Sequence, residues 1–213
     1  MKMSSFRWGV VVVIAVLFFA GVNHALQRWV ILPSFIKLEQ KQAETELQRV
    51  MDAIQREVEH IELLAGDWAV WDDTYRFVHN RNQNYIDSNL VWETLEGSSG
   101  INLLFFYNTQ GDFVWGDVFD SAQGGLIHVK EFPKDTPASI EVLFNHTTVD
   151  SSIAGIIDSN AGPMLIVSKP IVTSRGKGPI AGTMLMGRFL GKTLLERIKA
   201  LIAPKTPLKQ KRA

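Results

Sequence analysis

Residues 64–78 read LAGDWAVWDDTYRFV, and the interpretation of the whole chain starts from this stretch. In a helix, one face carries every third or fourth residue, and here that face is apolar. It consists of Leu64, Trp68, Trp71, Tyr75 and Val78. A second group, Val70, Asp73 and Phe77, lies away from that face and is also largely apolar. The pattern therefore predicts one helix over 64–78 that is buried nearly all round.

The same stretch carries three acids, Asp67, Asp72 and Asp73. A carboxylate that is removed from water needs a cationic or hydrogen-bonding partner, or else it takes up a proton. Arg76 follows Asp72 by four residues, a spacing at which side chains meet on a helix surface. Buried acids beside two indoles predict a cavity that receives a ligand.

Residues 68–75 read Trp-Ala-Val-Trp-Asp-Asp-Thr-Tyr, which resembles the Trp-x-x-Trp-Asp-Asp-x-Tyr signature of the CHASE4 family of bacterial and archaeal extracytoplasmic sensor domains. The resemblance continues in the family's order over residues 33–200. It includes Asn89-Leu90, Ile101-Asn102, a hairpin around Gly111, and the later Gly-Pro, Ser-Lys-Pro-Ile and Gly-Arg-Phe-Leu runs. The resemblance implies a PAS-like sensor fold with a ligand pocket between sheet and helices, and it says little about the ligand.

An apolar run, WGVVVVIAVLFFAGV, occupies residues 8–22 behind Lys2 and Arg7. Counted on to Arg28, it gives about 20 residues and about 30 Å of helix, which is enough to cross a bilayer. Positive charge on the short leading side places residues 1–7 in the cytoplasm and the rest of the chain outside. We therefore expect an anchor at 8–28 in the inner (cytoplasmic) membrane. A cleaved secretory signal is the alternative, although no convincing small-x-small site follows the run.

Composition and motif spacing argue against several classes of protein. The 22 Lys and Arg residues balance the 22 Asp and Glu residues, so no global field favours nucleic acid. Without cysteine there is no disulfide framework or thiolate metal site, and the five histidines lack zinc-ligand spacing. The spacing of a phosphate-binding loop is missed by one residue at Gly191-Lys192-Thr193. The spacing of a nucleophile elbow is likewise missed by one residue at Gly97-Ser98-Ser99-Gly100. We expect no cofactor, no metal and no enzyme activity.

Residues 34–65 are predicted to form one long helix. Its apolar residues recur at steps of about 3.5 residues, the spacing of a coiled-coil seam. They are Leu47, Val50, Ile54, Val58, Ile61, Ala65 and Trp68. We expect the membrane-near half of this stripe to pair with the same helix of a second chain in a homodimer. A solvated amphipathic stalk is the alternative.

Five strands are predicted after the signature, at 101–107, 113–119, 152–157, 163–168 and 179–188. The polar run 79–89 is expected to be a connection, 120–135 a surface excursion, and 137–146 a short helix. Residues 190–202 predict a closing amphipathic helix, stopped by Pro204 and followed by a basic tail, 203–213. The predicted class is α+β, with a five-stranded antiparallel sheet, helices on one face, and a sensor domain over 33–202.

These features predict the extracytoplasmic, small-molecule-sensing part of a membrane-anchored signal-transduction protein. Related sensors lead us to expect an output domain such as a diguanylate cyclase, a phosphodiesterase or a histidine kinase, which is not visible in this chain. The ligand is expected between the sheet and the signature helix. The expected binding residues are Trp68, Trp71, Asp72, Asp73, Tyr75, Asn102, Phe106 and Arg188.

In such a pocket the aromatic walls supply contact area and the charged groups orient the ligand. The acids suit an amine and Arg188 suits a carboxylate, so an amino acid-like ligand could use both. One alternative is a membrane-anchored hydrolase that uses Asp72 and Asp73 as general acid and base. Another is a protein-interaction module with an exposed apolar patch. A structural role also stays open, with the tryptophans in the core and the acids capping backbone groups or pairing with arginine.

Overall fold

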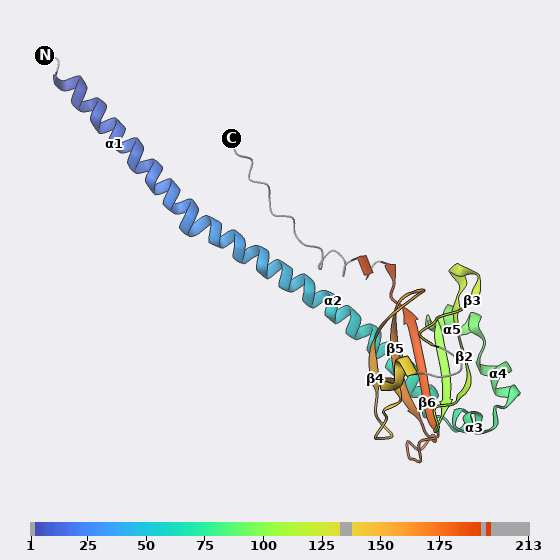
Figure 1. The fold of residues 1–213 in the computed structure, drawn as a ribbon. Coiled ribbons are helices and arrows are strands. Elements are labelled where there is room, and N and C mark those ends of the chain that lie inside the picture. Colours follow the sequence, from blue (N-terminus) through green and yellow to red (C-terminus); the bar gives the residue numbers. More distant parts are fainter. Residues whose placement is uncertain (1–2, 133–137, 193–194, 197–213) are drawn as a thin grey trace. The chain divides into compact units, whose positions relative to one another are not determined.

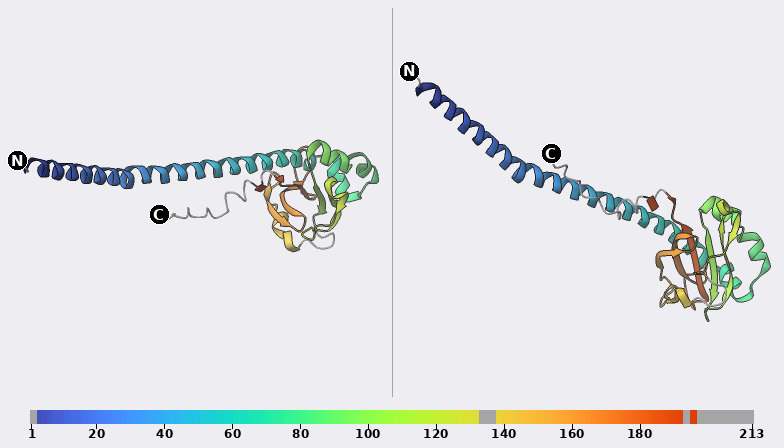
Figure 2. Two further views of the ribbon diagram at one scale, coloured as in Figure 1. Left: turned by 90° about the horizontal axis from the view of Figure 1, so that it is seen from above. Right: turned by 45° about the horizontal axis from the view of Figure 1, so that its top comes forward.

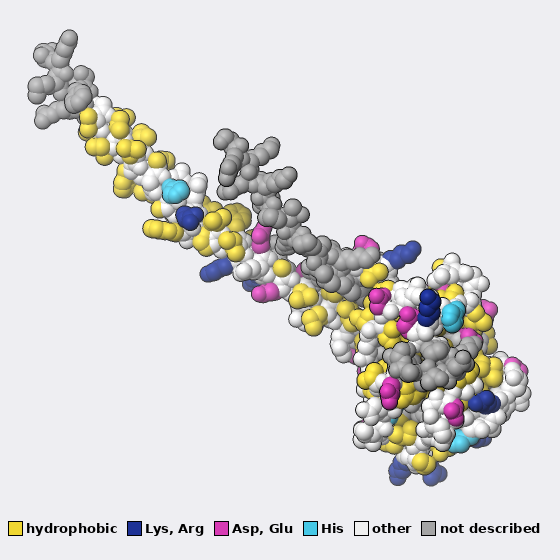
Figure 3. All heavy atoms as spheres, viewed as in Figure 1, with side chains coloured by type: hydrophobic (Ala, Val, Ile, Leu, Met, Phe, Trp, Pro, Cys, Tyr) yellow, Lys and Arg dark blue, Asp and Glu magenta, His cyan; other side chains and the backbone are white. Residues whose placement is uncertain are grey.

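The computed structural model describes residues 3–132, 138–192 and 195–196. The chain divides into two compact units, one with Met1–Met51 and Leu201–Ala213 and the other with Asp52–Ala200. The first unit holds α1 (Met3–Leu26), a π-helical segment (Gln27–Ile31) and the beginning of α2 (Leu32–Ala69). Among the described residues, the helical stretch Trp8–Ala69 contains one candidate membrane span, judged by length and composition. Figure 3 shows hydrophobic side chains over α1, as a lipid-facing surface requires.

The second unit is built on an antiparallel sheet of six strands in the order β3-β2-β1-β6-β5-β4 (Figure 1). The strands are β1 (Leu103–Asn108), β2 (Phe113–Asp120), β3 (Gly125–Ile127), β4 (Ile153–Ser159), β5 (Gly162–Ile171) and β6 (Gly182–Phe189). The prediction of five strands is wrong by one, because β3 lies within the expected surface excursion. Gly124 and Gly125 have φ values of 93° and 125°, which let the chain turn back along β2. A strand of three residues is too short to show alternation in the sequence.

Three short helices follow α2: α3 (Asp72–Asn80), α4 (Gln83–Asn89) and α5 (Trp92–Ser99). The run 79–89 is therefore not a plain connection, because it contains α4. Two 3₁₀ segments cover Ser121–Gln123 and Ala138–Phe144, and the second replaces the short helix expected at 137–146. The closing helix expected at 190–202 falls mostly outside the described residues, and the tail 203–213 falls wholly outside them.

The two faces of the sheet carry separate hydrophobic cores, as alternation along each strand requires. The helical face packs α2, α3, α4 and α5 against strand residues that include Leu104, Phe106, Leu165 and Met184 (Figures 1 and 2). The opposite face packs Leu103, Phe105, Tyr107, Ile166 and Leu185 under Val129, Phe132 and Leu143. Residues 103–107 of β1 are at most 2% exposed, which confirms the expected central strand covered on both faces.

The signature is not one helix, and the prediction of a continuous helix over 64–78 is wrong. α2 ends at Ala69, Trp71 has extended backbone angles (φ −141°, ψ 131°), and α3 begins at Asp72. Between the helices, Val70 pairs in parallel with Val172, and the Val172 N–H donates to the Ala69 carbonyl at 2.9 Å. A hydrogen bond to the sheet thus replaces the next bond of the helix.

The prediction that the three acids are buried is also wrong. Asp67 and Asp72 are exposed, and the Asp73 side chain retains 44% of its accessible surface. Asp72 and Asp73 stand in the first turn of α3, where the positive end of the helix dipole favours carboxylates near water. The break at residues 70 and 71 therefore moves Asp72 and Asp73 from the middle of a buried helix to the start of a partly exposed one, while Asp67 lies at an exposed position of α2.

Candidate functional site

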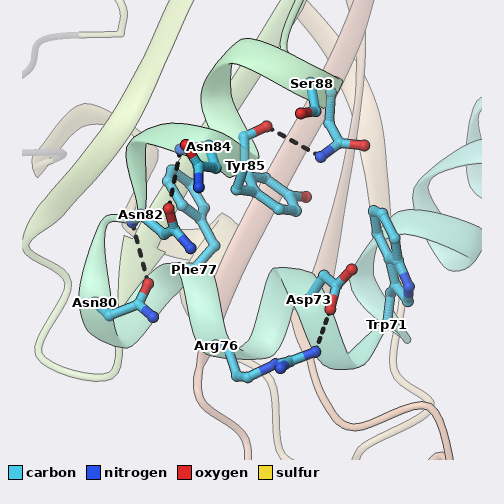
Figure 4. A pocket seen from close by; sticks show the side chains of 10 residues that line it. Trp71, Asp73, Arg76, Phe77, Asn80, Asn82, Asn84, Tyr85 and Ser88 are labelled. Carbon is cyan, nitrogen blue, oxygen red and sulfur yellow. Dashed lines mark hydrogen bonds and ion pairs between the residues drawn. The ribbon is translucent and has the colours of Figure 1, made fainter.

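A pocket of about 430 Å³ opens between α3 and α4, and Figure 4 shows it from close by. Its lining consists of Trp71, Asp73, Arg76, Phe77, Asn80, Asn82, Asn84, Tyr85, Ser88 and Asn89. All of these belong to α3, to α4 or to residues directly beside them. The pocket therefore lies between two helices, and not between the sheet and the signature helix as the sequence led us to expect.

Asparagines hold the turn that joins α3 to α4. Arg81 ends α3 in the left-handed conformation (φ 51°), and its guanidinium donates to the Phe113 carbonyl of β2 at 3.0 Å. The Asn82 side-chain oxygen caps α4 by accepting from the Asn84 N–H at 2.9 Å, while the Asn80 oxygen accepts from the Asn82 N–H at 3.1 Å. The polar run 80–84 thus shapes one wall of the pocket.

The floor of the pocket is aromatic. Phe77 and Tyr85 stack with ring centroids 4.5 Å apart, and the Trp71 ring lies 5.8 Å from Tyr85. The Tyr85 hydroxyl shares a hydrogen bond of 2.7 Å with the buried Thr74 hydroxyl. Burial raises the pKa of Tyr85 to about 12, so its ring presents a neutral phenol at physiological pH.

Asp73 and Arg76 are the charged residues of the described lining, and they form an ion pair. The guanidinium also donates through Nε to the Asp72 carbonyl at 3.2 Å. The expected helical pairing of Arg76 is therefore made with Asp73 through its side chain and with Asp72 through its backbone. The Asp73 side chain is 44% exposed and the Arg76 side chain 68%, so solvent screens the attraction between them. The ion pair therefore stabilises the fold by at most about 1 kcal/mol.

Of the expected binding residues, Trp71 and Asp73 line this pocket. Trp68 and Tyr75 are half-buried against the core of the helical face. Phe106 is fully buried, and its ring lies edge-on to Phe77 with centroids 5.5 Å apart, so it supports the pocket without lining it.

Asp72 holds a loop instead of lining the pocket. Its carboxylate accepts from the Ser174 N–H at 2.9 Å, and its own N–H donates to the Ser174 hydroxyl, also at 2.9 Å. These reciprocal bonds fasten the start of α3 to the connection between β5 and β6. Since this carboxylate already has a structural partner, it is poorly placed to share a reaction with Asp73.

Asn102 and Arg188 lie at a different part of the sheet. The Asn102 side chain donates to the Phe119 carbonyl at 3.0 Å and accepts from the Phe189 N–H at 3.1 Å. From its position just before β1, it thus bonds to both of the strands that flank β1, namely β2 and β6. Arg188 donates to Glu57 of α2 at 2.6 Å and to the Ser99 carbonyl at 2.5 Å. The structure therefore does not bring the expected residues into one site.

Sequence reasoning missed most of the polar residues that do line the pocket. Asn89 takes part in the family resemblance, but the run 79–89 that contains it was interpreted as a connection. Within the described residues, no group of three or more His, Asp or Glu side chains is arranged to hold a metal ion. The chemistry of the pocket is therefore that of hydrogen bonding, one ion pair and aromatic contact.

A comparison with protein families identifies one family for this chain. The CHASE4 domain profile matches residues 53–206. The Methanogenesis regulatory histidine kinase FilI of Methanothrix harundinacea (strain 6Ac) is 26% identical over 201 residues, which make up 92% of this chain and 21% of that protein. The chain thus spans about a fifth of the length of this curated relative.

A solved structure supports the fold independently. The extracellular domain of vpHK1S-Z8, described as a putative histidine kinase, superposes with a TM-score of 0.57 at 14% sequence identity. The match covers 81% of this chain and 63% of that one. At this identity the likeness concerns the fold alone.

Proposed function

The chain belongs to the CHASE4 family of sensor domains, and from this premise we propose that its pocket between α3 and α4 binds a small polar molecule outside the membrane. One observation carries the proposal: the pocket is walled by Trp71, the residue at the joint between α2 and α3. A ligand there contacts the connection that directly follows the long helix leading from the candidate membrane span. A pocket of about 430 Å³ is within the usual size range of small-molecule sites.

The proposed signal is a displacement of α2. Ala69, the last residue of α2, is hydrogen-bonded to Val172 of the sheet, and Trp71 follows after one residue. A ligand that packs on the Trp71 indole favours one conformation of the connection between α2 and α3 over another. The ligand can shift α2 only to the extent that it binds the two conformations with different affinity.

The membrane arrangement and the partner are parts of the same proposal. The apolar surface of α1 supports an anchor in the inner (cytoplasmic) membrane, with the sheet and its helices on the outer side. A homodimer is proposed through the membrane-near half of α2, where Leu47 is 51% exposed, because the stripe from Ile54 to Trp68 packs against the chain's own core. The kinase relative makes a histidine kinase the favoured output, and the family resemblance is the basis for proposing a PAS-like core.

The hydrolase alternative is less well supported, because the two carboxylates have different partners. Asp72 is bonded to Ser174 and Asp73 to Arg76. As neighbours in one helix they also point about 100° apart. A general acid and a general base need to face one substrate.

A thermal-shift screen tests ligand binding. The full chain in nanodiscs is heated with amino acids, organic acids, amines and sugars, one compound at a time. A ligand at 100 times its Kd should stabilise the protein by about 2.7 kcal/mol. Ser88→Trp fills the pocket and should abolish the shift, whereas Gln83→Trp, on the same helix but outside the lining, should retain it. The proposal fails if no compound shifts the melting temperature, or if the shift survives in Ser88→Trp.

Cross-linking tests the movement of α2. Because the chain has no cysteine, Leu47→Cys introduces the only thiol of its variant, at a position of the apolar stripe that is 51% exposed. Disulfide formation between two copies should occur at this position and change in rate when a ligand is added. Gln55→Cys, at an exposed polar position of the same helix, is the matched control and should cross-link less. Equal cross-linking at both positions would exclude pairing through the apolar stripe.

A further inference from the structure

The ion pair in the pocket disfavours a charged ligand, and this inference rests on the function proposed above. Asp73 and Arg76 are the charged residues of the described lining and contact each other directly, so this lining has no net charge. Figure 4 shows the guanidinium directed at Asp73. An anion that approaches the guanidinium also approaches the carboxylate that repels it, and a cation meets the reverse arrangement. A neutral molecule meets no such repulsion.

Neutral polar side chains make up half of the lining, and some of their hydrogen-bonding atoms are already used. A backbone N–H can only donate, so the side-chain atom that receives it must be an oxygen. The amide oxygens of Asn80 and Asn82 receive the N–H groups of residues 82 and 84, which leaves the two NH₂ groups as donors. Asn89 is the reverse case, because its NH₂ group donates to the Tyr85 carbonyl at 3.0 Å and leaves its oxygen as an acceptor.

Two further side chains of the lining, Asn84 and Ser88, have no hydrogen-bond partner among the described residues. An amide and a hydroxyl can each both donate and accept. The pocket therefore offers donors and acceptors together, on groups that carry no charge.

Hydroxyl groups match this mixture, because each hydroxyl donates one hydrogen bond and accepts others. A carboxylate only accepts and an ammonium only donates, so either group would leave one kind of partner in the lining unused. The hydrogen-bonding atoms thus favour a ligand that carries several hydroxyl groups.

Trp71 adds an aromatic wall to these polar groups. Its side chain is half-buried, and Figure 4 shows the indole on the opposite side of Tyr85 from Asn82 and Asn84. The face of an indole is negative and attracts C–H groups, which a sugar ring presents on its own faces while its hydroxyls project from the rim. A sugar ring can therefore lie on the indole and direct its hydroxyls to the amides.

From this arrangement we infer that the pocket binds a neutral sugar in its ring form. Its hydroxyls accept from the NH₂ groups of Asn80 and Asn82 and donate to the Asn89 oxygen. This assignment differs from the amino acid-like ligand expected with Arg188, whose guanidinium is used by Glu57 and the end of α5.

Calorimetric titration of the full chain in nanodiscs with neutral pentoses, hexoses and disaccharides tests the inference. At least one should bind, and the uronic acid and the amino sugar with the same ring should each bind at least tenfold more weakly. Asn84→Ala and Ser88→Ala should each weaken the sugar at least fivefold. Gln83→Ala, on the same helix but outside the lining, should change the affinity less than twofold. Circular dichroism of each variant shows whether it is folded.

Asp73→Asn tests the role of the ion pair. It removes the carboxylate that contacts Arg76, so the pocket gains a net positive charge. The affinity for the uronic acid, relative to that for the neutral sugar, should rise at least threefold. An unchanged ratio would contradict the argument that the pair disfavours charged ligands.

The outcomes separate the inference from the function on which it rests. If the uronic acid or the amino sugar binds the unmutated chain as tightly as the neutral sugar, the assignment is wrong and the pocket remains a ligand site. The assignment is equally wrong if no sugar binds while an amino acid, an amine or an organic acid gives a thermal shift that Ser88→Trp abolishes. If nothing in either set binds, both the inference and the proposed function fail.

Discussion

Replacing Arg188 by alanine should destabilise the sheet unit by about 3 kcal/mol. The Arg188 side chain is only 18% exposed, and it donates to Glu57 at 2.6 Å and to the carbonyls of Ser99 and Gly100 at 2.5 and 3.0 Å. It also approaches Nδ1 of His60 at 3.2 Å. One side chain thus joins β6 to α2 and to the carboxyl end of α5, where the helix dipole favours a cation.

The magnitude follows from these contacts. Breaking a buried ion pair costs about 3–5 kcal/mol, but Glu57 is 42% exposed and regains water, so the loss of this pair falls below that range. The two carbonyls that lose a charged donor add about 1 kcal/mol each. With about 2–4 °C per kcal/mol for a domain of this size, the melting temperature should fall by about 6–12 °C.

Urea unfolding followed by tryptophan fluorescence measures the change, since the chain has six tryptophans. Arg49→Ala is the matched control: this arginine pairs with Glu46 at 3.2 Å, but the two side chains are 70% and 46% exposed. It should cost less than about 0.5 kcal/mol. Arg188→Lys keeps the charge without the planar fork and should recover about half of the loss. An Arg188→Ala cost within about 1 kcal/mol of the Arg49→Ala cost would refute the reasoning.

Other substitutions test the cores and the pH dependence. Tyr107→Phe should stabilise the protein by about 1 kcal/mol, because the fully buried Tyr107 hydroxyl has no hydrogen-bond partner among the described residues. Tyr85→Phe should instead destabilise it by about 1 kcal/mol, because it removes the hydrogen bond of 2.7 Å to Thr74. Unfolding in denaturant measures both changes. Burial, reinforced by the charge of Lys169, lowers the pKa of His146 below 6.5, so the unfolded state binds more protons in acid. Stability should therefore fall as the pH drops below about 6.5, and the same melts should show a weaker fall in His146→Gln. Gly187→Ala should cost about 1–3 kcal/mol in a thermal melt, because its Cβ would lie 2.9 Å from a backbone oxygen of the next strand.

The local sequence pattern was sufficient to predict a helix or strand wherever buried apolar residues recur regularly along it. The apolar run of β1 and the turn sequences that separate the later strands predicted five of the six strands near their observed positions. The long leading helix was predicted for the same reason, since its stripe extends over several turns. β3 escaped because its pairing with β2 depends on two glycines with positive φ and on only three residues.

Long-range contacts decided what the sequence pattern could not. The apolar spacing runs through residues 64–78 without interruption, yet the helix stops at Ala69. The Ala69 carbonyl accepts a hydrogen bond from the N–H of Val172, which is about 100 residues away in the sequence. Two adjacent acids before a short apolar run also favour the start of a helix, and that signal competed with the periodicity. The pocket was misplaced as a consequence, since its position depends on where α3 begins.

The break at Trp71 also explains how one short motif serves both the fold and the pocket that we propose for a ligand. In the first turn of a helix, neighbouring side chains diverge by about 100°, so Asp72 can hold Ser174 while Asp73 turns toward Arg76 and the pocket. Trp71, extended between the helices, contributes its indole to the same pocket. An unbroken helix would direct these groups into the core, where carboxylates are costly. The interruption of the helix is therefore what allows an acid-rich signature to lie next to a hydrophobic core and still contribute side chains to a pocket.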